Sequence, residues 1–464
     1  MKKAKIQKRY IYRGLCTMLM CLIATGMFFV AWYGFVRENN HTGFLLGLGN
    51  LGMACGIYLI FYYFIGKSLR TFRIGVDRKA NLLASQVMTL FLVDFIETFV
   101  SCAITGQFRY YHIFALIYIV LAFAQSFILC LLVMPLVDFY RKLFKPQRII
   151  EIYGDDTNEK TEFMNERPDK YKIIDSISAG EGVDKIIEML PEYEAVLLND
   201  IPSELKNIIL KECFRIGQRV YFTPKISDII GKNSENINLF DTPLYLCRNS
   251  GISGGQRILK RIFDLFFATL ALIVLSPIFV IVAIAIKLED RGPVFYKQDR
   301  VTIGGKVFGI VKFRSMIEDA EKDGKPIPAG EDDDRITKVG RFIRATRIDE
   351  LPQLINIIAG DMSIVGPRPE RVEHVEKYTQ DIPEFAFRLK VKGGLTGVAQ
   401  VFGKYNTSPL NKLKMDLYYI TNYSLLLDLQ IIFETVKILV QKESTEGFTK
   451  EKQEEMREQE QKDI

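Results

Sequence analysis

Residues 113–137 read IFALIYIVLAFAQSFILCLLVMPLV, an apolar run without a charged side chain. A helix needs about 20 mostly apolar residues to cross the hydrocarbon core of a bilayer, so this run is long enough to span one. Earlier runs at residues 11–36, 43–65 and 83–104 have the same character. We therefore expect residues 1–140 to form a four-helix transmembrane domain.

Basic residues gather before the first run, between the second and third runs, and after the fourth. They are Lys2, Lys3, Lys5, Lys8, Arg9 and Arg13, then Lys67, Arg70, Arg73, Arg78 and Lys79, then Arg141, Lys142, Lys145 and Arg148. By the positive-inside rule these segments face the cytoplasm. A cleaved signal peptide is not expected, because the first run is long and lacks a small-residue cleavage site.

The composition narrows the class of protein. The 464 residues are 48% hydrophobic and 25% charged, so apolar and charged residues must be segregated along the chain. The net charge of +6 suits a negatively charged partner, whether anionic lipid, nucleotide or nucleic acid. Seven cysteines form no CxxC pair, and three histidines are too few for a zinc site or a Ser-His-Asp triad to be expected.

Residues 148–248 show short β-like runs that alternate with helix-like runs. This alternation predicts a small Rossmann-like α/β domain with a parallel sheet. The first strand ends in Tyr153-Gly154-Asp155-Asp156, where a dinucleotide site needs GxGxxG. We therefore favour a degenerate nucleotide fold, used for regulation or assembly, over cofactor binding.

A fifth apolar run, residues 265–286, is interrupted by Ser276 and Pro277. Proline removes a helical hydrogen bond, and a neighbouring serine can satisfy the freed carbonyl. A straight spanning helix would carry everything after it to the outer side, away from nucleotide substrates. We therefore expect a re-entrant helix over residues 258–286, which breaks at Ser276 and Pro277 and returns to the cytoplasmic face.

Asp349 and Glu350 are the candidate catalytic pair. The pattern predicts a helix that begins at this pair, has Pro352 in its first turn and stops at Gly360. A carboxylate at a helix N-terminus is held ionised by the helix dipole, which also attracts phosphate oxygens. Asp349 is therefore a plausible nucleophile.

Arg344, Arg347 and Arg368 accompany this acidic pair. A lone arginine is by default a surface or ion-pair residue, but three near two carboxylates favour a phosphate site, because guanidinium groups bind phosphate bidentately. With no histidine available, the pattern indicates phosphoryl chemistry in which a divalent metal bridges carboxylate and pyrophosphate.

Five motifs carry a resemblance to a known family. They are Lys312-Phe313-Arg314-Ser315-Met316, Asp349-Glu350-Leu351-Pro352-Gln353-Leu354, Gly360-Asp361-Met362-Ser363, Gly366-Pro367-Arg368-Pro369 and Gly394-Leu395-Thr396-Gly397. Residues 256–442 resemble the bacterial sugar transferase family, the monotopic phosphoglycosyl transferases. The whole chain is similar to its large members, which have an N-terminal four-helix membrane domain.

The resemblance implies an α-rich catalytic domain over residues 256–442 that transfers a sugar 1-phosphate from a UDP-sugar to undecaprenyl (polyprenyl) phosphate and releases UMP. The reaction would be ping-pong through a phospho-aspartyl intermediate and would initiate exopolysaccharide, capsule, O-antigen or glycan assembly. Asp349 would be the nucleophile, and Asp349 and Glu350 would hold Mg²⁺. The phosphate-binding candidates are Lys312, Arg314, Arg344, Arg347 and Arg368.

The expected partners are the UDP-sugar, polyprenyl phosphate, membrane lipid and possibly a second copy of the chain, but no nucleic acid. The expected location is the bacterial cytoplasmic (inner) membrane, with several spans and a cytoplasmic catalytic domain. Residues 443–464 form a charged, solvated tail. A transporter fits poorly, and a catalytically silent scaffold or regulator is opposed by the intact Asp349-Glu350 pair. The sugar, the pathway and the role of Asp94 and Glu97 stay open.

Overall fold

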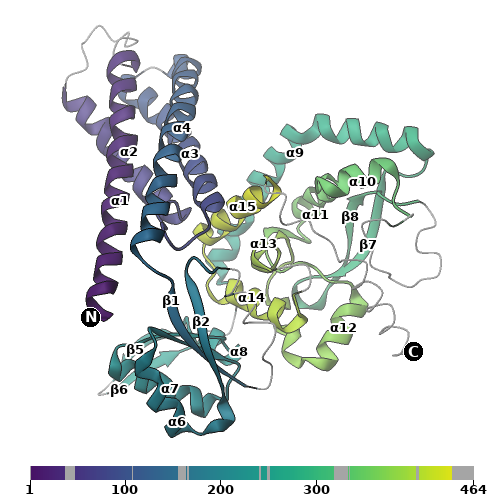
Figure 1. Cartoon of the computed structure of the whole chain (residues 1–464). Helices are drawn as coiled ribbons and strands as arrows, with labels where there is room; N and C mark the ends of the chain where they lie inside the picture. Colours follow the sequence, from purple (N-terminus) through teal and green to yellow (C-terminus); the bar gives the residue numbers. More distant parts are fainter. Residues whose placement is uncertain are drawn as a thin grey trace. The chain divides into compact units, whose positions relative to one another are not determined.

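The computed structural model describes residues 2–36, 48–106, 108–154, 164, 167–239, 242–247, 251–317, 333, 335–403 and 407–440. The chain divides into two compact units, Met1–Pro224 and Lys225–Ile464 (Figure 1). The boundary between them lies inside the segment 148–248 that was expected to form one domain. The tail at residues 443–464 lies outside the described residues.

Four long helices begin the first unit. They are α1 (Lys2–Ala31), continued by a π-helical turn (Trp32–Val36), α2 (Leu48–Ser68), α3 (Lys79–Thr105) and α4 (Tyr111–Leu143). Each is long and apolar enough to cross a membrane, which confirms the predicted helical membrane part. Inside the bundle the ring of Phe28 stacks on Tyr58 with centroids 4.3 Å apart. Asp94 and Glu97 of α3 also lie inside, 1% and 0% exposed, and their role stays open.

The rest of the first unit is a parallel sheet. Its strands are β1 (Gln147–Tyr153), β2 (Tyr171–Ser178), β3 (Ala195–Asn199) and β4 (Arg219–Phe222), in the order β2-β1-β3-β4. Ile150 and Ile152 of β1 pack with residues of the helices α6 (Val183–Met189) and α7 (Ser203–Ile216) in one core. The predicted parallel sheet is therefore confirmed.

Gly154, at the end of β1, serves the packing of the sheet itself. Its N–H donates to the carbonyl of Asn199 at 2.9 Å, and a Cβ at this position would come within 2.2 Å of the carbonyl oxygen of Asp200. A glycine is needed because two backbones meet here. This close approach explains the glycine without a bound phosphate.

The second unit begins with α8 (Ile226–Gly231) and a hairpin of β5 (Glu235–Leu239) and β6 (Thr242–Leu246). Ile229 of α8 is 6% exposed and belongs to the same core as Leu413 and Leu417. The side-chain amide of Asn233 donates to the carbonyl of Thr421 at 2.6 Å. These contacts attach α8 and the turn after it to the catalytic part of the chain.

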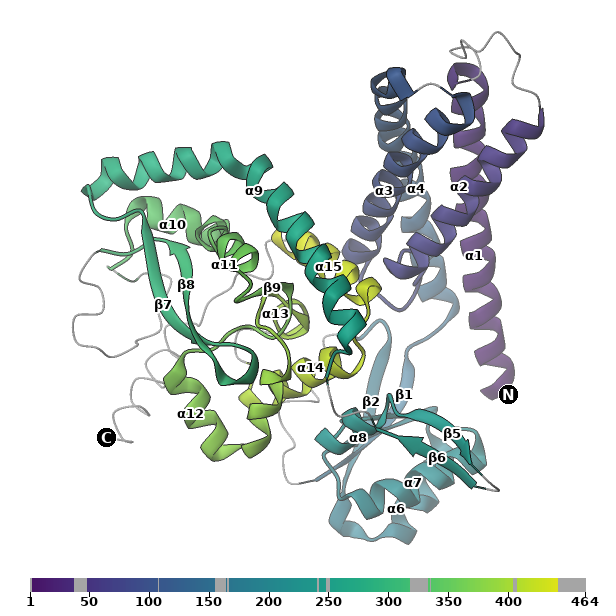
Figure 2. The same ribbon diagram turned by 180° about the vertical axis from the view of Figure 1, so that it is seen from behind.

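The helix α9 (Gly254–Asp290) contains the fifth apolar run and is the fifth described helix that is long and apolar enough to cross a membrane. It remains continuous through Pro277, and Figure 2 shows that its middle is bent. The hydroxyl of Ser276 donates to the carbonyl of Ile273 at 2.7 Å. Pro277 has no N–H for that carbonyl, so Ser276 satisfies the acceptor that the proline leaves free.

A hairpin of β7 (Phe295–Val301) and β8 (Val307–Phe313) follows α9. The later helices are α10 (Lys338–Ala345), α11 (Gln353–Ala359), α12 (Val372–Asp381), a 3-10 helix (Pro383–Lys390), α13 (Val398–Phe402), α14 (Pro409–Thr421) and α15 (Leu425–Val440). The short strands β9 (Ser363–Val365) and β10 (Gly394–Thr396) pair in parallel. They bring the GPRP and GLTG motifs together.

Candidate active site

The Asp349-Glu350 pair lies in a 3-10 turn, Ile348–Glu350, between α10 and α11. The predicted end of the following helix is right, because Gly360, with a φ of 95°, caps α11. Its predicted start is wrong, because α11 begins at Gln353. Pro352 has no N–H to donate, so the hydrogen-bond ladder is interrupted between the turn and the helix. A helix dipole therefore contributes less to the pair than the neighbouring side chains do.

Asp349 is a carboxylate without a partner for one of its oxygens. Its Oδ1 is buried and accepts no hydrogen bond from any described residue. Burial raises the pKa of Asp349, and the charge of Glu350 adds to the rise. The positive charges of Lys312, Arg344 and Arg347 oppose this rise in pKa. A buried acceptor is costly to leave unsatisfied, so this oxygen is suited to an incoming ligand.

Glu350 is held by two cations. The Nζ of Lys312 lies 2.9 Å from its Oε1, and the Nη2 of Arg368 lies 2.6 Å from the same oxygen. Burial alone would raise the pKa of Glu350, but Arg368 and Lys312 outweigh it and hold the pKa well below the ordinary value. Glu350 therefore stays ionised, and its position is fixed by both partners.

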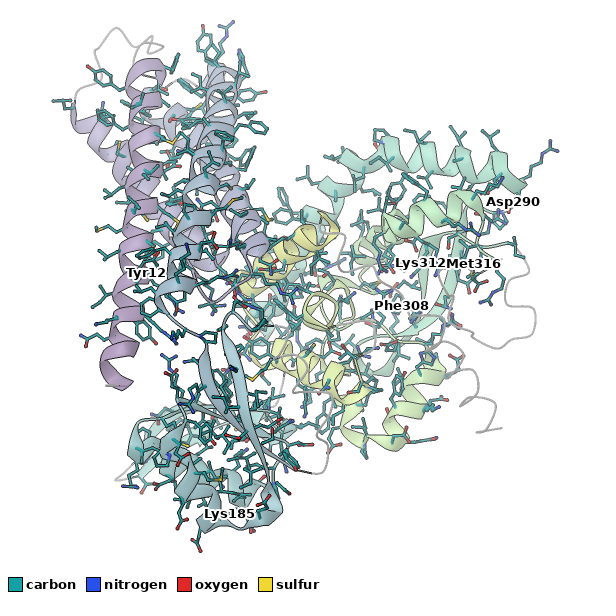
Figure 3. The ribbon with its side chains drawn as sticks, viewed as in Figure 1. Tyr12, Lys185, Asp290, Phe308, Lys312 and Met316 are labelled. Atoms are coloured by element: carbon teal, nitrogen blue, oxygen red, sulfur yellow. The ribbon has the colours of Figure 1, made fainter. Side chains whose placement is uncertain are left out.

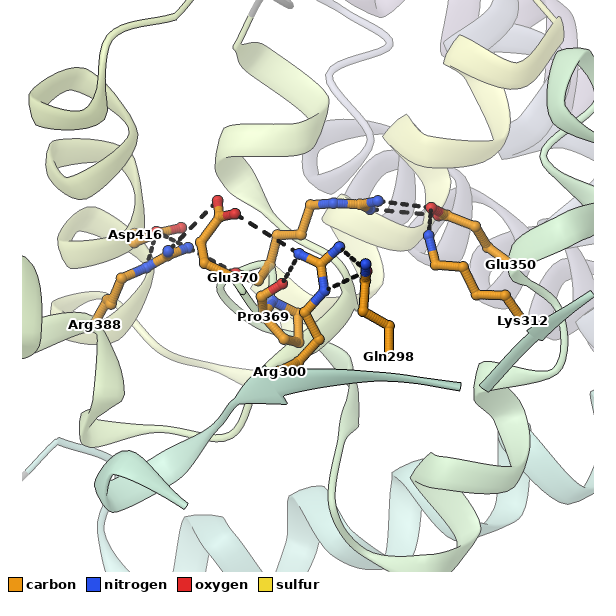
Figure 4. A network of polar contacts seen from close by, with 9 residues as sticks. Gln298, Arg300, Lys312, Glu350, Pro369, Glu370, Arg388 and Asp416 are labelled. Atoms are coloured by element: carbon orange, nitrogen blue, oxygen red, sulfur yellow. Dashed lines mark hydrogen bonds and ion pairs between the residues drawn. The ribbon is translucent and has the colours of Figure 1, made fainter. Parts of the chain in front are cut away.

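Behind this pair the charges alternate, as Figure 4 shows. Arg300 lies 3.9 Å from Glu370, and Arg388 lies 3.7 Å from the same carboxylate. Arg388 also pairs with Asp416 at 2.8 Å, with side chains that are 3% and 1% exposed. Its Nη2 donates to the carbonyl of Arg368 at 2.8 Å. The network thus fixes the backbone that presents Arg368 to Glu350.

The five predicted phosphate-binding residues divide into two groups. Lys312, Arg344, Arg347 and Arg368 all lie near the carboxylate pair. Arg314 instead forms an ion pair with Asp290 at the end of α9, and its side chain is 7% exposed. Figure 3 labels Asp290 beside α9 and Lys312 on β8. Within the described part of the chain, the side chains of Arg344 and Arg347 form no ion pair, which leaves both available to a substrate.

Arg388 and Asp416 were not singled out from the sequence. A signal was present on α14, where Asp416 has the helical spacing of Leu413, Leu417 and Ile420, three buried apolar residues. A carboxylate on an apolar face predicts a buried cationic partner.

The carboxylate pair fits a Mg²⁺ ion that has one protein ligand. Mg²⁺ is commonly bound by one or two carboxylates together with phosphate oxygens of the substrate. The unpartnered oxygen of Asp349 meets that need, whereas Glu350 is engaged by Lys312 and Arg368. Among the residues that the structure describes, no group of three or more His, Cys, Asp or Glu side chains gathers to hold a metal.

Apolar membrane-length helices, an α/β part and a carboxylate pair among cations define a membrane-associated protein with a site suited to phosphate-bearing substrates. Residues 255–442 match the family described as bacterial sugar transferase. Over 280 residues the chain is 42% identical to the UDP-glucose:undecaprenyl-phosphate glucose-1-phosphate transferase of Klebsiella pneumoniae, which covers 57% of each chain.

Two further relatives support this match. Over 255 residues the chain is 36% identical to the UDP-N-acetylgalactosamine-undecaprenyl-phosphate N-acetylgalactosaminephosphotransferase of Aeromonas hydrophila, covering 53% of this chain and 59% of that protein. Over 187 residues it is 42% identical to a UDP-glucose:undecaprenyl-phosphate glucose-1-phosphate transferase of Caulobacter vibrioides, covering 39% of this chain and 69% of that protein. The chain therefore belongs to the bacterial sugar transferase family, although it spans little more than half of the Klebsiella and Aeromonas proteins.

Proposed function

We propose that this chain transfers a sugar 1-phosphate from a UDP-sugar to undecaprenyl (polyprenyl) phosphate and releases UMP. The observation that carries the proposal is Asp349, whose buried Oδ1 has no partner in the described structure and lies among the charges of Lys312, Arg344 and Arg347. The relatives named above act on UDP-glucose and on UDP-N-acetylgalactosamine. Their names support the same substrate class here and leave the sugar to experiment.

In the first step Asp349 attacks the phosphorus that bears the sugar. A bond forms between the carboxylate oxygen and phosphorus, and the bond from phosphorus to the UMP oxygen breaks, so UMP leaves with that electron pair. Arg344 and Arg347 bind the phosphate oxygens on which charge accumulates. The unpartnered oxygen of Asp349 is the atom that forms the new bond.

Glu350 has a different role, because both of its cationic partners hold it in place. Its negative charge keeps Lys312 and Arg368 oriented beside Asp349, and these cations also face the substrate phosphates. A carboxylate engaged in this way is a poor nucleophile. The division of roles within the pair therefore follows from their contacts.

A Mg²⁺ ion would neutralise charge on the pyrophosphate when bound. Asp349 is the described residue whose free oxygen suits it, and Glu350 is an indirect supporter that positions the cations around the site. Both assignments extend the Asp349 and Glu350 metal site proposed from the sequence.

In the second step the phosphate of the polyprenyl carrier attacks the phosphorus of the phospho-aspartyl sugar. The new oxygen–phosphorus bond forms as the bond to Asp349 breaks, which regenerates the carboxylate. The carrier is a membrane lipid, and the exposed apolar side chains of α9, such as Ile273 at 66% and Ile281 at 66%, suit a lipid environment. This step explains why the site is joined to a membrane helix.

We infer that α9 is re-entrant and that the catalytic part faces the cytoplasm of a bacterial inner membrane. Basic residues flank the helix on both sides, with Lys260 and Arg261 near its start and Lys287 and Arg291 at its end. The proline and the bend give the helix a place to turn. UDP-sugars are cytoplasmic, so this topology brings both substrates to one face.

UMP release is the direct test. Purified protein is mixed with polyprenyl phosphate, Mg²⁺ and each of several UDP-sugars, with Asp349→Asn as the matched control. Release that depends on both substrates and disappears in Asp349→Asn supports the transferase. A well-folded protein that releases UMP from no UDP-sugar in the panel would favour the silent scaffold.

A further inference from the structure

The loop between α2 and α3 is fixed by two arginines that come from other elements. Arg13 of α1 donates from Nε to the carbonyl of Ile74 at 3.0 Å. Arg167, which precedes β2, donates from Nη1 to the carbonyl of Val76 at 3.1 Å. Because the two carbonyls are two residues apart, they lie at most about 7 Å apart along the chain. The two guanidinium groups are therefore brought to the same short loop.

Two more cations join them. Arg73 is exposed and immediately precedes the loop residue that Arg13 binds, and Lys170 is joined to Arg167 by a backbone hydrogen bond of 2.9 Å. Burial lowers the pKa of Lys170 to about 8, and the charges of Arg167, Arg13 and Arg73 add to that effect while Asp77 opposes it. Positive charge is thus concentrated beyond what Asp77 offsets.

The nearby carboxylate of Asp169 does not relieve this concentration. It already pairs with Arg167 at 3.0 Å and with Arg141 at 3.0 Å. Arg13 is bound by a backbone carbonyl and by the hydroxyl of Tyr140, at 2.9 Å, rather than by a carboxylate. The guanidinium of Arg13 therefore keeps its full charge beside Lys170.

The cluster lies at the ends of membrane-length helices, since α2 ends at Ser68, α3 begins at Lys79 and α4 ends at Leu143. That is the level of lipid headgroups, where basic side chains meet anionic phosphate. We propose that Arg13, Arg73 and Lys170 bind the phosphodiester headgroup of an anionic membrane lipid. Arg13 and Arg73 belong to the helical bundle and Lys170 to the α/β part, so the lipid joins the two parts of the first unit.

Thermal unfolding of the full-length chain tests the site. Protein stripped of lipid in neutral detergent is melted at low salt with phosphatidylglycerol, with diacylglycerol, or with inorganic phosphate. Phosphatidylglycerol at about 100 times its Kd should raise the melting temperature by about 5 °C, because it binds only the folded state. Diacylglycerol, which has no phosphate, should leave it unchanged.

The variant that removes the site is Arg73→Gln with Lys170→Gln, which should lose at least half of the shift. Neither side chain has a described carboxylate ion pair, so this variant should melt no lower than the wild type without lipid. The matched control is Lys185→Gln with Lys211→Gln, which removes the same charge from α6 and α7 and should keep the full shift.

Three results would overturn the proposal. Diacylglycerol would give the same shift as phosphatidylglycerol, the site variant would keep the full shift, or the control would lose as much as the site variant. An equal shift from inorganic phosphate alone would place a free anion in the site and reject the lipid.

Discussion

Replacing Glu350 with Gln should move the acidic limb of the pH–rate profile to lower pH. Burial raises the pKa of Asp349, the charge of Glu350 raises it further, and Lys312 opposes the rise. Two unit charges about 6 Å apart interact by about 3 kcal/mol at an effective dielectric constant near 20. That energy equals about two pKa units, so removing the charge should shift the limb by about one to two units after solvent screening.

The sign follows from the form of Asp349 that reacts. Attack needs the carboxylate, so the rate falls as the pH drops through the pKa of Asp349, which burial places above the ordinary value near 3.9. Without the charge of Glu350 that pKa falls, and Asp349 remains ionised at lower pH. Lys312 and Arg368, at 2.9 and 2.6 Å from Glu350, lose their partner and act in the same direction.

The assay is single-turnover capture of a labelled sugar by the protein between about pH 4 and 8, which isolates the first step from the carrier lipid. Asp361→Asn is the control, because its carboxylate pairs with the exposed Lys306 at 3.0 Å. An acidic limb that stays in place or moves upward in Glu350→Gln would refute the reasoning, as would an equal shift in Asp361→Asn.

Three further predictions concern stability and topology. Arg388→Met strips a buried carboxylate of its partner and should lower the free energy of unfolding by about 3–5 kcal/mol in denaturant titration; a change below about 1 kcal/mol would contradict it. A chain that begins at Lys225 should release UMP, whereas one that begins at Gly251 lacks α8 and should melt at a lower temperature; equal melting would show that α8 contributes nothing. Changing Ser276 and Pro277 together to Leu should straighten α9 and abolish activity, with a cysteine placed after the helix becoming labelled from outside intact cells; cytoplasmic labelling with full activity would reject the re-entrant turn.

Features that depend on local sequence were predictable. Uninterrupted apolar length predicted the membrane helices, because few other structures bury such runs. The alternation of short strands and helices predicted the parallel sheet. The hydrogen bond from Ser276 to Ile273 was likewise expected, because Pro277 leaves a specific carbonyl unsatisfied.

Features that depend on contacts distant in sequence were not. The predicted start of the helix at Asp349 was wrong, because the sequence did not show that the turn and α11 would separate at Pro352. Arg314 lies in the same motif as Lys312, yet its partner is Asp290, 24 residues away. The pairing of Arg388 with a carboxylate 28 residues further on had no motif to announce it.

Covalent capture by Asp349 is the most direct test of the central claim. Wild-type protein is incubated with Mg²⁺ and a UDP-sugar that releases UMP, quenched before carrier lipid is added, and its intact mass is measured. A mass increase of one sugar phosphate, mapped to the peptide that contains Asp349 and absent from Asp349→Asn, is the predicted result. The same adduct on folded Asp349→Asn, or capture at another residue in the wild type, would contradict the claim.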